Sequence, residues 1–72
     1  MKKIKKIKIK LNGKTRLINK NLSIQNLVNE FKIPIKKVAI ELNEEILNKK
    51  MLKKIKIKKN DKIEIVHFIG GG

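Results

Sequence analysis

The stretch over residues 7–18, I-K-I-K-L-N-G-K-T-R-L-I, decides how the fold begins. Its first half alternates isoleucine or leucine with lysine, and this period of two is the pattern of a β-strand with one buried face. The pair Asn12-Gly13 tolerates the positive φ angles of a type I′ turn, which is the strongest short signal for a β-hairpin. The sequence therefore predicts an antiparallel pair whose second strand covers residues 14–18.

A short helix is predicted to follow this hairpin. The hydroxyl oxygen of Ser23 can accept a hydrogen bond from the first helical turn and cap the helix. Pro34 is expected to end it, because the residue before a proline favours an extended backbone. Four apolar residues recur between them at helical spacing and define one stripe that would face a core: Ile24, Leu27, Val28 and Phe31.

The second half of the chain has the pattern of three further strands. They are predicted over residues 38–42, 45–47 and 62–68. Turns are expected at Asn43-Glu44 and at Asn60-Asp61, because these residue types favour turns. Residues 48–59 are ambiguous between a turn of helix and extended chain.

The order strand, strand, helix, strand, strand, strand predicts an α+β domain, a mixed sheet of four to five strands with one helix packed on one face. A connection that contains a helix suits parallel neighbours, so the first and last strands are expected to form a central parallel pair. This arrangement is the β-grasp of ubiquitin-like proteins. Residues 1–68 would form the domain and residues 69–72 a flexible glycine tail.

The chain is strongly basic, with 20 Lys and Arg against 6 Asp and Glu among 72 residues and a formal net charge of +14. Lys, Asn and Ile make up 41 of the residues, and all three have A/T-rich codons, so gene composition is one explanation of the charge. A surface for an acidic partner or a nucleic acid is the other. Two Phe with no Tyr or Trp give no stacking platform for bases, so a nucleic-acid-binding module is the weaker alternative and no specific nucleic acid is expected as a partner.

The inventory of catalytic side chains is small, because the chain has one His, one Ser, one Thr, no Cys and no glycine-rich nucleotide-binding motif. Neither a nucleophile with its base nor a nucleotide cradle can be assembled from these residues. We therefore expect no enzyme activity, no metal site and no bound cofactor, and we interpret His67 as an ordinary strand residue. The chain also shows no apolar run of membrane-spanning length and no signal peptide, so a cytoplasmic protein without a membrane partner is expected.

Three glycines follow the last predicted strand. A backbone without Cβ atoms can thread a narrow channel, with the α-carboxylate of Gly72 at its tip. An ordinary frayed end is the other explanation. Just before the glycines both faces of the strand become apolar, and the uncovered face of a one-helix sheet could dock a partner there. The candidate docking residues are Val66, Phe68 and Ile69.

The residues that carry a family resemblance lie in the second half of the chain. They are V-A-I-E-L-N over residues 38–43, Glu45-Ile46, and N-D-K-I-E-I-V-H-F-I-G-G-G over residues 60–72. This pattern resembles the ThiS family, the sulfur carrier proteins of thiamine biosynthesis, and the length, strand order and Asn12-Gly13 turn agree with it. Glu44 and Asn60 stand where the family often has glycine.

The resemblance implies that the chain is a protein-borne substrate. The Gly72 carboxylate would be adenylated in a partner adenylyltransferase of the ubiquitin-activating type, with Gly70 and Gly71 threading its channel. A sulfur donor, such as a cysteine desulfurase or a rhodanese-type protein, would convert the adenylate into a thiocarboxylate, and thiazole synthase would take the sulfur. ATP and Mg²⁺ would be used by the partner and not bound by this chain.

Two relatives of this fold remain alternatives within the same class. The small subunit of molybdopterin synthase also ends in Gly-Gly, but its usual proline-containing approach to the glycines is missing here. The second alternative is a ubiquitin-like modifier.

Overall fold

The computed structural model describes residues 5–68, so the predicted glycine tail at 69–72 lies outside the described residues. The elements follow in the predicted order. They are β1 Lys6–Leu11, β2 Lys14–Asn19, α1 Ile24–Glu30, the 3-10 helix η1 Ile35–Lys37, β3 Val38–Leu42, β4 Glu45–Ile46, the 3-10 helix η2 Lys49–Met51 and β5 Lys62–His67.

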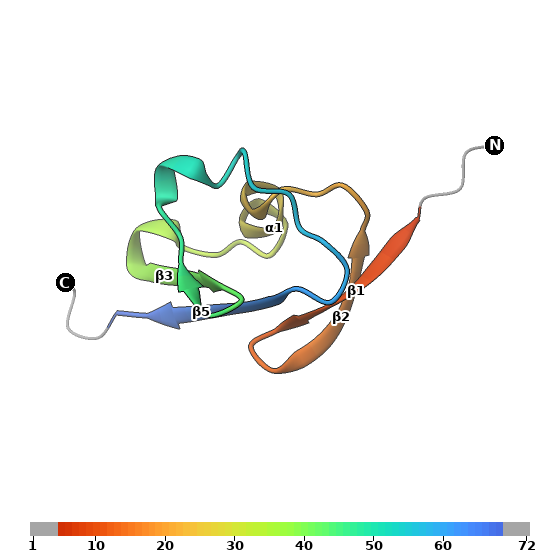
Figure 1. Cartoon of the computed structure of the whole chain (residues 1–72). Coiled ribbons are helices and arrows are strands. Elements are labelled where there is room, and N and C mark those ends of the chain that lie inside the picture. The colour runs from red at the N-terminus through yellow and green to blue at the C-terminus, as the bar shows by residue number, and fades with distance from the viewer. Residues whose placement is uncertain (1–4, 69–72) are drawn as a thin grey trace.

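The strands form one mixed sheet in the order β2-β1-β5-β3-β4. The first and last strands are parallel neighbours at its centre, and the other pairs are antiparallel. The helix α1 lies across one face of this sheet (Figure 1). The predicted α+β fold, a β-grasp with a central parallel pair, is therefore confirmed.

The β1–β2 turn forms as predicted, with φ of 51° at Asn12 and 79° at Gly13. It also extends the central pairing, because the Asn12 backbone N–H donates to the Ile63 carbonyl at 2.9 Å. The Asn12 side-chain oxygen accepts from the Ile65 N–H at 2.7 Å. The turn between β1 and β2 thus also holds β5, which comes from the other end of the sequence.

The start of α1 confirms the predicted cap. The Ser23 hydroxyl oxygen accepts from the Asn26 backbone N–H at 3.1 Å, and the Asn26 side chain accepts from the Ser23 backbone N–H at 3.0 Å. This reciprocal pair is a capping box that satisfies two donors left free at a helix start. It explains how a buried serine is tolerated at the edge of an apolar core.

The end of α1 differs from the prediction. The helix ends at Glu30 because Lys32 takes the left-handed φ of 53°, and the Ile33 N–H donates back to the Val28 carbonyl at 3.0 Å. This is a Schellman ending, and Pro34 only begins the following 3-10 helix.

The placement of Phe31 on the buried stripe is also wrong. It is the C-cap residue, lies outside the buried cluster and is 37% exposed. Its ring instead lies 5.7 Å from the guanidinium carbon of Arg16.

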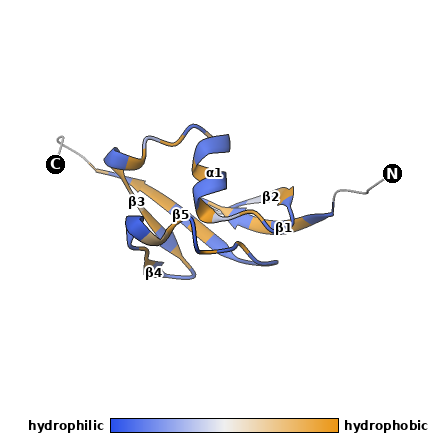
Figure 2. Ribbon diagram, turned by 90° about the horizontal axis from the view of Figure 1, so that it is seen from above, coloured by the Kyte–Doolittle hydropathy of each residue, from blue (hydrophilic) through white to orange (hydrophobic). Residues whose placement is uncertain are grey.

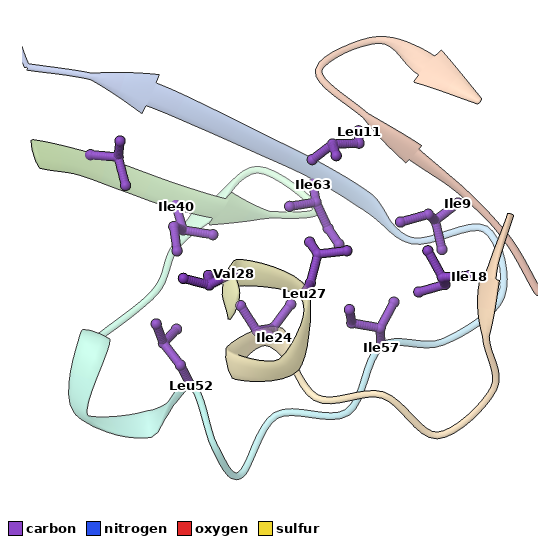
Figure 3. Packing of buried hydrophobic residues seen from close by; sticks show 11 residues of the cluster. Ile9, Leu11, Ile18, Ile24, Leu27, Val28, Ile40, Leu52, Ile57 and Ile63 are labelled. Carbon is purple, nitrogen blue, oxygen red and sulfur yellow. The ribbon is translucent and has the colours of Figure 1, made fainter. Parts of the chain in front are cut away.

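The core lies between α1 and the sheet. The strands carry hydrophobic and hydrophilic residues in alternation (Figure 2), and their hydrophobic faces meet the helix (Figure 3). Eleven apolar side chains are buried there: Ile9, Leu11, Ile18, Ile24, Leu27, Val28, Val38, Ile40, Leu52, Ile57 and Ile63. Burial of this apolar surface is the main favourable term for a domain of this size.

The ambiguous segment over residues 48–59 is one 3-10 turn followed by extended chain. Leu52 and Ile57 are buried, at 1% and 3% exposed. Backbone hydrogen bonds fix the segment against the start of α1, from the Ile24 N–H to the Ile55 carbonyl and from the Ile57 N–H to the Leu22 carbonyl. It therefore closes the core beside the helix.

The β3–β4 turn holds two residues in the left-handed region, Asn43 at φ 51° and Glu44 at φ 73°. Asn43 is anchored, since its side chain donates to the Asp61 carboxylate at 3.1 Å and accepts from the Lys62 N–H at 2.9 Å. Glu44 has only an exposed ion pair with Lys62 at 3.8 Å. Left-handed backbone is costly for a residue with a long side chain, so Glu44 is a point of local strain.

We expect Glu44→Gly to raise the free energy of unfolding by about 0.5–1 kcal/mol. Glycine removes the steric cost of the positive φ, and an exposed ion pair contributes little. Glu45→Gly is the matched control, because it removes the same charge from a residue in β4 and should lower stability. Urea unfolding of both variants measures the change in the free energy of unfolding. Equal changes in the two variants would contradict the local strain at Glu44.

Candidate functional site

The end of β5 is the part of the described chain that leads toward Ile69 and the three glycines. β5 is the central strand, so both its long edges are paired, with β1 on one side and β3 on the other. The start of β1 and the end of β5 lie at opposite ends of the molecule (Figure 1). The glycines therefore continue from the best-anchored strand of the sheet.

The alternation along β5 divides its side chains as the sequence predicts. Ile63 is fully buried under the helix, and Ile65 is half-buried against the core. Val66 faces the other way, opposite Ala39 of β3, and is 49% exposed. An apolar side chain thus lies on the sheet face that α1 leaves open.

Phe68 lies one residue beyond the end of β5, although the sequence predicts the strand to include it. Its backbone still continues the pairing with β3, because its N–H donates to the Lys37 carbonyl at 2.9 Å. Its side chain is 50% exposed, and the Lys49 ammonium nitrogen lies 5.4 Å from the ring centre. We call Val66 and Phe68, with Ala39 of β3 opposite Val66, the apolar patch.

The patch has a basic border. Lys37 contributes its backbone to Phe68 and Lys49 its ammonium group, and both lysines are exposed. A half-exposed aromatic ring beside positive charge suits recognition of a protein surface that combines apolar and acidic groups.

The described residues hold no pairing of a nucleophile with a base. The Ser23 hydroxyl is committed to the helix cap, and Thr15 is exposed on β2, away from His67 on β5. His67 is exposed opposite Val38. Within residues 5–68 no three His, Asp or Glu side chains gather as metal ligands, and no helix is long and apolar enough to cross a membrane.

Two of the three predicted docking residues are therefore placed by the structure. Val66 and Phe68 are exposed near the end of β5, whereas Ile69 and Gly70 to Gly72 lie outside the described residues. The contact of Lys49 with Phe68 was not predicted. It joins the ambiguous segment to the end of the chain, and no local pattern indicates such a pairing.

Comparison with known proteins gives consistent matches over nearly the whole chain. The family model described as "ThiS family" matches residues 9–72. The sulfur carrier protein ThiS of Bacillus subtilis is 38% identical over 65 residues, which cover 89% of this chain and 98% of that protein. A crystal structure of the thiamine biosynthesis protein (ThiS) from Geobacter metallireducens has a TM-score of 0.82 and 28% identity, and covers 92% of this chain and 100% of that one.

A larger protein also matches. A thiazole synthase of Paramagnetospirillum magneticum is 36% identical over 66 residues, which cover 92% of this chain. The match covers only 20% of that protein, so this chain spans about one fifth of its length.

Proposed function

Because this chain belongs to the ThiS family, we propose that the α-carboxylate of Gly72 is the group on which it carries sulfur. Members of the family are small sulfur carrier proteins of thiamine biosynthesis and not themselves enzymes. The family model extends through residue 72, which includes all three glycines. The match therefore reaches the end of the glycine tail, and this observation supports the proposal.

The proposed chemistry has two steps, both performed in partner proteins. An oxygen of the Gly72 carboxylate attacks the α-phosphorus of ATP, a new P–O bond forms, and pyrophosphate leaves with Mg²⁺ that the partner supplies. The terminal sulfur of a persulfide on the sulfur donor then attacks the carbonyl carbon, AMP leaves, and an acyl disulfide forms, which a neighbouring thiol cleaves by forming a new disulfide with the donor sulfur. The product is a thiocarboxylate. A carboxylate needs a good leaving group before a sulfur nucleophile can displace it, and the adenylate provides one.

Glycine at residues 70 to 72 serves both steps. Without Cβ atoms the backbone can enter a channel too narrow for other residues, and neither approach to the carbonyl carbon is obstructed. Fixing each glycine in such a channel costs about 1–2 kcal/mol of conformational entropy. The tail is therefore a poor anchor, and affinity must come from the folded domain.

We propose the apolar patch, continued by Ile69, as that anchor. Val66 and Phe68 are half-exposed, although each is large and apolar, and Phe68 is held at the point where the chain leaves the sheet. Aromatic residues in such positions commonly dominate binding energy. The basic border formed by Lys37 and Lys49 would face acidic groups of the adenylyltransferase.

Thiazole synthase is proposed as the acceptor of the sulfur. Segments of two thiazole synthases are similar to 92% of this chain, which shows that such a carrier-like domain occurs within proteins of that name. A cysteine desulfurase or a rhodanese-type protein is proposed as the sulfur donor.

The experiment that tests the carrier function is intact-mass analysis. The chain is incubated with a cognate adenylyltransferase, ATP, Mg²⁺ and a sulfur source, and the expected product has one oxygen replaced by one sulfur. Fragmentation should place the change at Gly72. A form whose terminal carboxylate is converted to an amide is the control and should stay unmodified. Modification at a lysine, or no reaction while an established carrier reacts, would refute the proposal.

A further inference from the structure

A concave site lined by lysines lies at the other end of the molecule from the apolar patch. Its volume is about 460 Å³, within the usual size of small-molecule sites. Six lysines line it, and we call it the lysine groove: Lys5, Lys6, Lys20, Lys56, Lys58 and Lys59. Ile7 and Ile57 are the apolar residues among its lining.

Three segments that are distant in sequence form the walls of the lysine groove. They are the start of β1, the turn after β2 and the extended chain before β5. Backbone hydrogen bonds join every pair of walls. The Lys20 N–H donates to the Lys5 carbonyl at 2.8 Å, the Ile57 N–H to the Leu22 carbonyl at 2.8 Å, and the Asn60 N–H to the Lys8 carbonyl at 2.8 Å. The lysines thus project from a closed frame of backbone.

Two further contacts fix the third wall. The Lys58 N–H donates to the Asp61 carboxylate at 2.7 Å, and the same carboxylate accepts from the Asn43 amide at 3.1 Å. The Lys56 ammonium group donates to the Asn21 carbonyl at 3.3 Å. Asp61 is therefore already bonded to the chain, although it is the acidic residue closest in sequence to these lysines.

The charge in the lysine groove is of one sign. Among the described residues no Asp or Glu lines it, and neither Lys62 nor Glu44, which form an ion pair, is a lining residue. A cleft lined by one sign of charge concentrates the field and attracts ligands of the opposite charge. Gene composition would account for how many lysines the chain has, but not for why six of them line one hollow.

We propose that the lysine groove binds a short chain of linked phosphate groups, of the kind found in inorganic triphosphate. Lysine binds phosphate as a compact point charge, and the flexible side chains of the lysines that line one hollow can bring several ammonium groups to a bound chain of phosphates. A compact, highly charged ligand also matches a bounded volume. The proposal does not depend on the sulfur carrier function.

The lysine groove fits a nucleic acid less well. Sites for single strands combine positive charge with aromatic side chains on which bases stack. The two phenylalanines of the chain lie elsewhere, Phe31 beside Arg16 and Phe68 beside Lys49. The apolar side chains that line the groove are aliphatic, so they offer no platform on which bases could stack, and contact with phosphates would come from the lysines.

The test is titration with inorganic triphosphate at about 150 mM salt, a concentration that screens diffuse surface charge over about 8 Å. We expect one triphosphate to bind to each chain with saturation. Calorimetry and the amide chemical shifts of the protein measure this binding. The shifts should concentrate at Ile7, Asn21 and Ile57. Shifts spread over all exposed lysines, or no saturation, would overturn the proposal.

Matched charge variants provide the second measurement. The double variant K20Q/K59Q removes two lysines from two walls and should weaken triphosphate binding roughly tenfold or more, since charge-assisted hydrogen bonds are lost. K36Q/K50Q removes the same charge from the 3-10 helices η1 and η2, outside the groove, and should change affinity less than about threefold. Equal weakening by both pairs overturns the proposal. Displacement of triphosphate by a short single-stranded DNA at lower concentration also overturns it and assigns the groove to nucleic acid.

Discussion

Deletion of Gly72 is expected to abolish sulfur loading and to leave the melting temperature unchanged. The truncated chain would still offer a glycine carboxylate, on Gly71, so its chemical reactivity is the same. The carboxylate is withdrawn by about 3.3–3.6 Å, the span of one extended residue. A displacement of even about 1 Å can cost roughly 100-fold in rate. Stability should persist, because the buried side chains of the described residues lie between Ile9 and Ile63.

ATP–pyrophosphate exchange with the adenylyltransferase measures this effect directly. Addition of one glycine after Gly72 is the matched variant, because it moves the same carboxylate by the same distance in the other direction and should also fail. Gly71→Val keeps the length but adds branched bulk inside the channel, and it too should block exchange. Near-normal exchange by the truncated chain would show that reach does not position the carboxylate.

Ile63→Ala is expected to lower the free energy of unfolding by about 2–5 kcal/mol, the range for removing a fully buried isoleucine from a core. Ile63 is 0% exposed and pairs across the sheet with Leu11 on one side and Leu42 on the other. The loss therefore leaves a cavity at the centre of the sheet. At roughly 0.05–0.15 kcal/mol per residue, a 72-residue chain has little stability in reserve, so a large part of it would be lost.

Phe68→Ala is the contrasting variant, because the ring is larger but half-exposed at the end of β5. We expect it to change stability by less than about 1 kcal/mol. Binding of the adenylyltransferase should weaken by about 1–3 kcal/mol if the ring is an anchor. Urea unfolding and calorimetric binding separate the two effects. Equal destabilisation by both variants would make Phe68 a core residue and remove it from the docking surface.

The fold is largely predictable because its signals are local. The Asn12-Gly13 turn and the alternation on either side of it specify the first hairpin, and Ser23 specifies where the helix begins. The central parallel pair follows from topology, since a helix-containing connection must return the chain to a parallel neighbour. The structure confirms each of these features.

The errors arise where the sequence carries no local pattern that indicates the conformation. Phe31 fits the helical spacing, but the helix ends before it because Lys32 takes a left-handed conformation. A lysine in the sequence does not indicate such a conformation. The sequence of residues 48–59 has no regular alternation of apolar and polar residues. Its conformation is set by backbone hydrogen bonds to the segment around Leu22 and Ile24.

Of the two candidate sites, one can be predicted from the sequence and the other cannot. Val66 and Phe68 are predictable because a single strand displays the break in alternation that exposes them. The lysine groove is not, because its walls come from three separated segments and each looks like an ordinary solvated run of lysines. Only the pairing of those segments reveals the hollow.

The central position of β5 also fixes when the sheet can close during synthesis. On the ribosome, β1 and β2 can pair early, yet the strand that joins them to β3 is the last described element to be made. Until residues 62–67 have been translated, β1 and β3 each lack a neighbour and present unpaired backbone to other chains. A nascent chain stalled before Lys62 would therefore be a target for chaperones or aggregation, whereas arrival of β5 completes the sheet in one step.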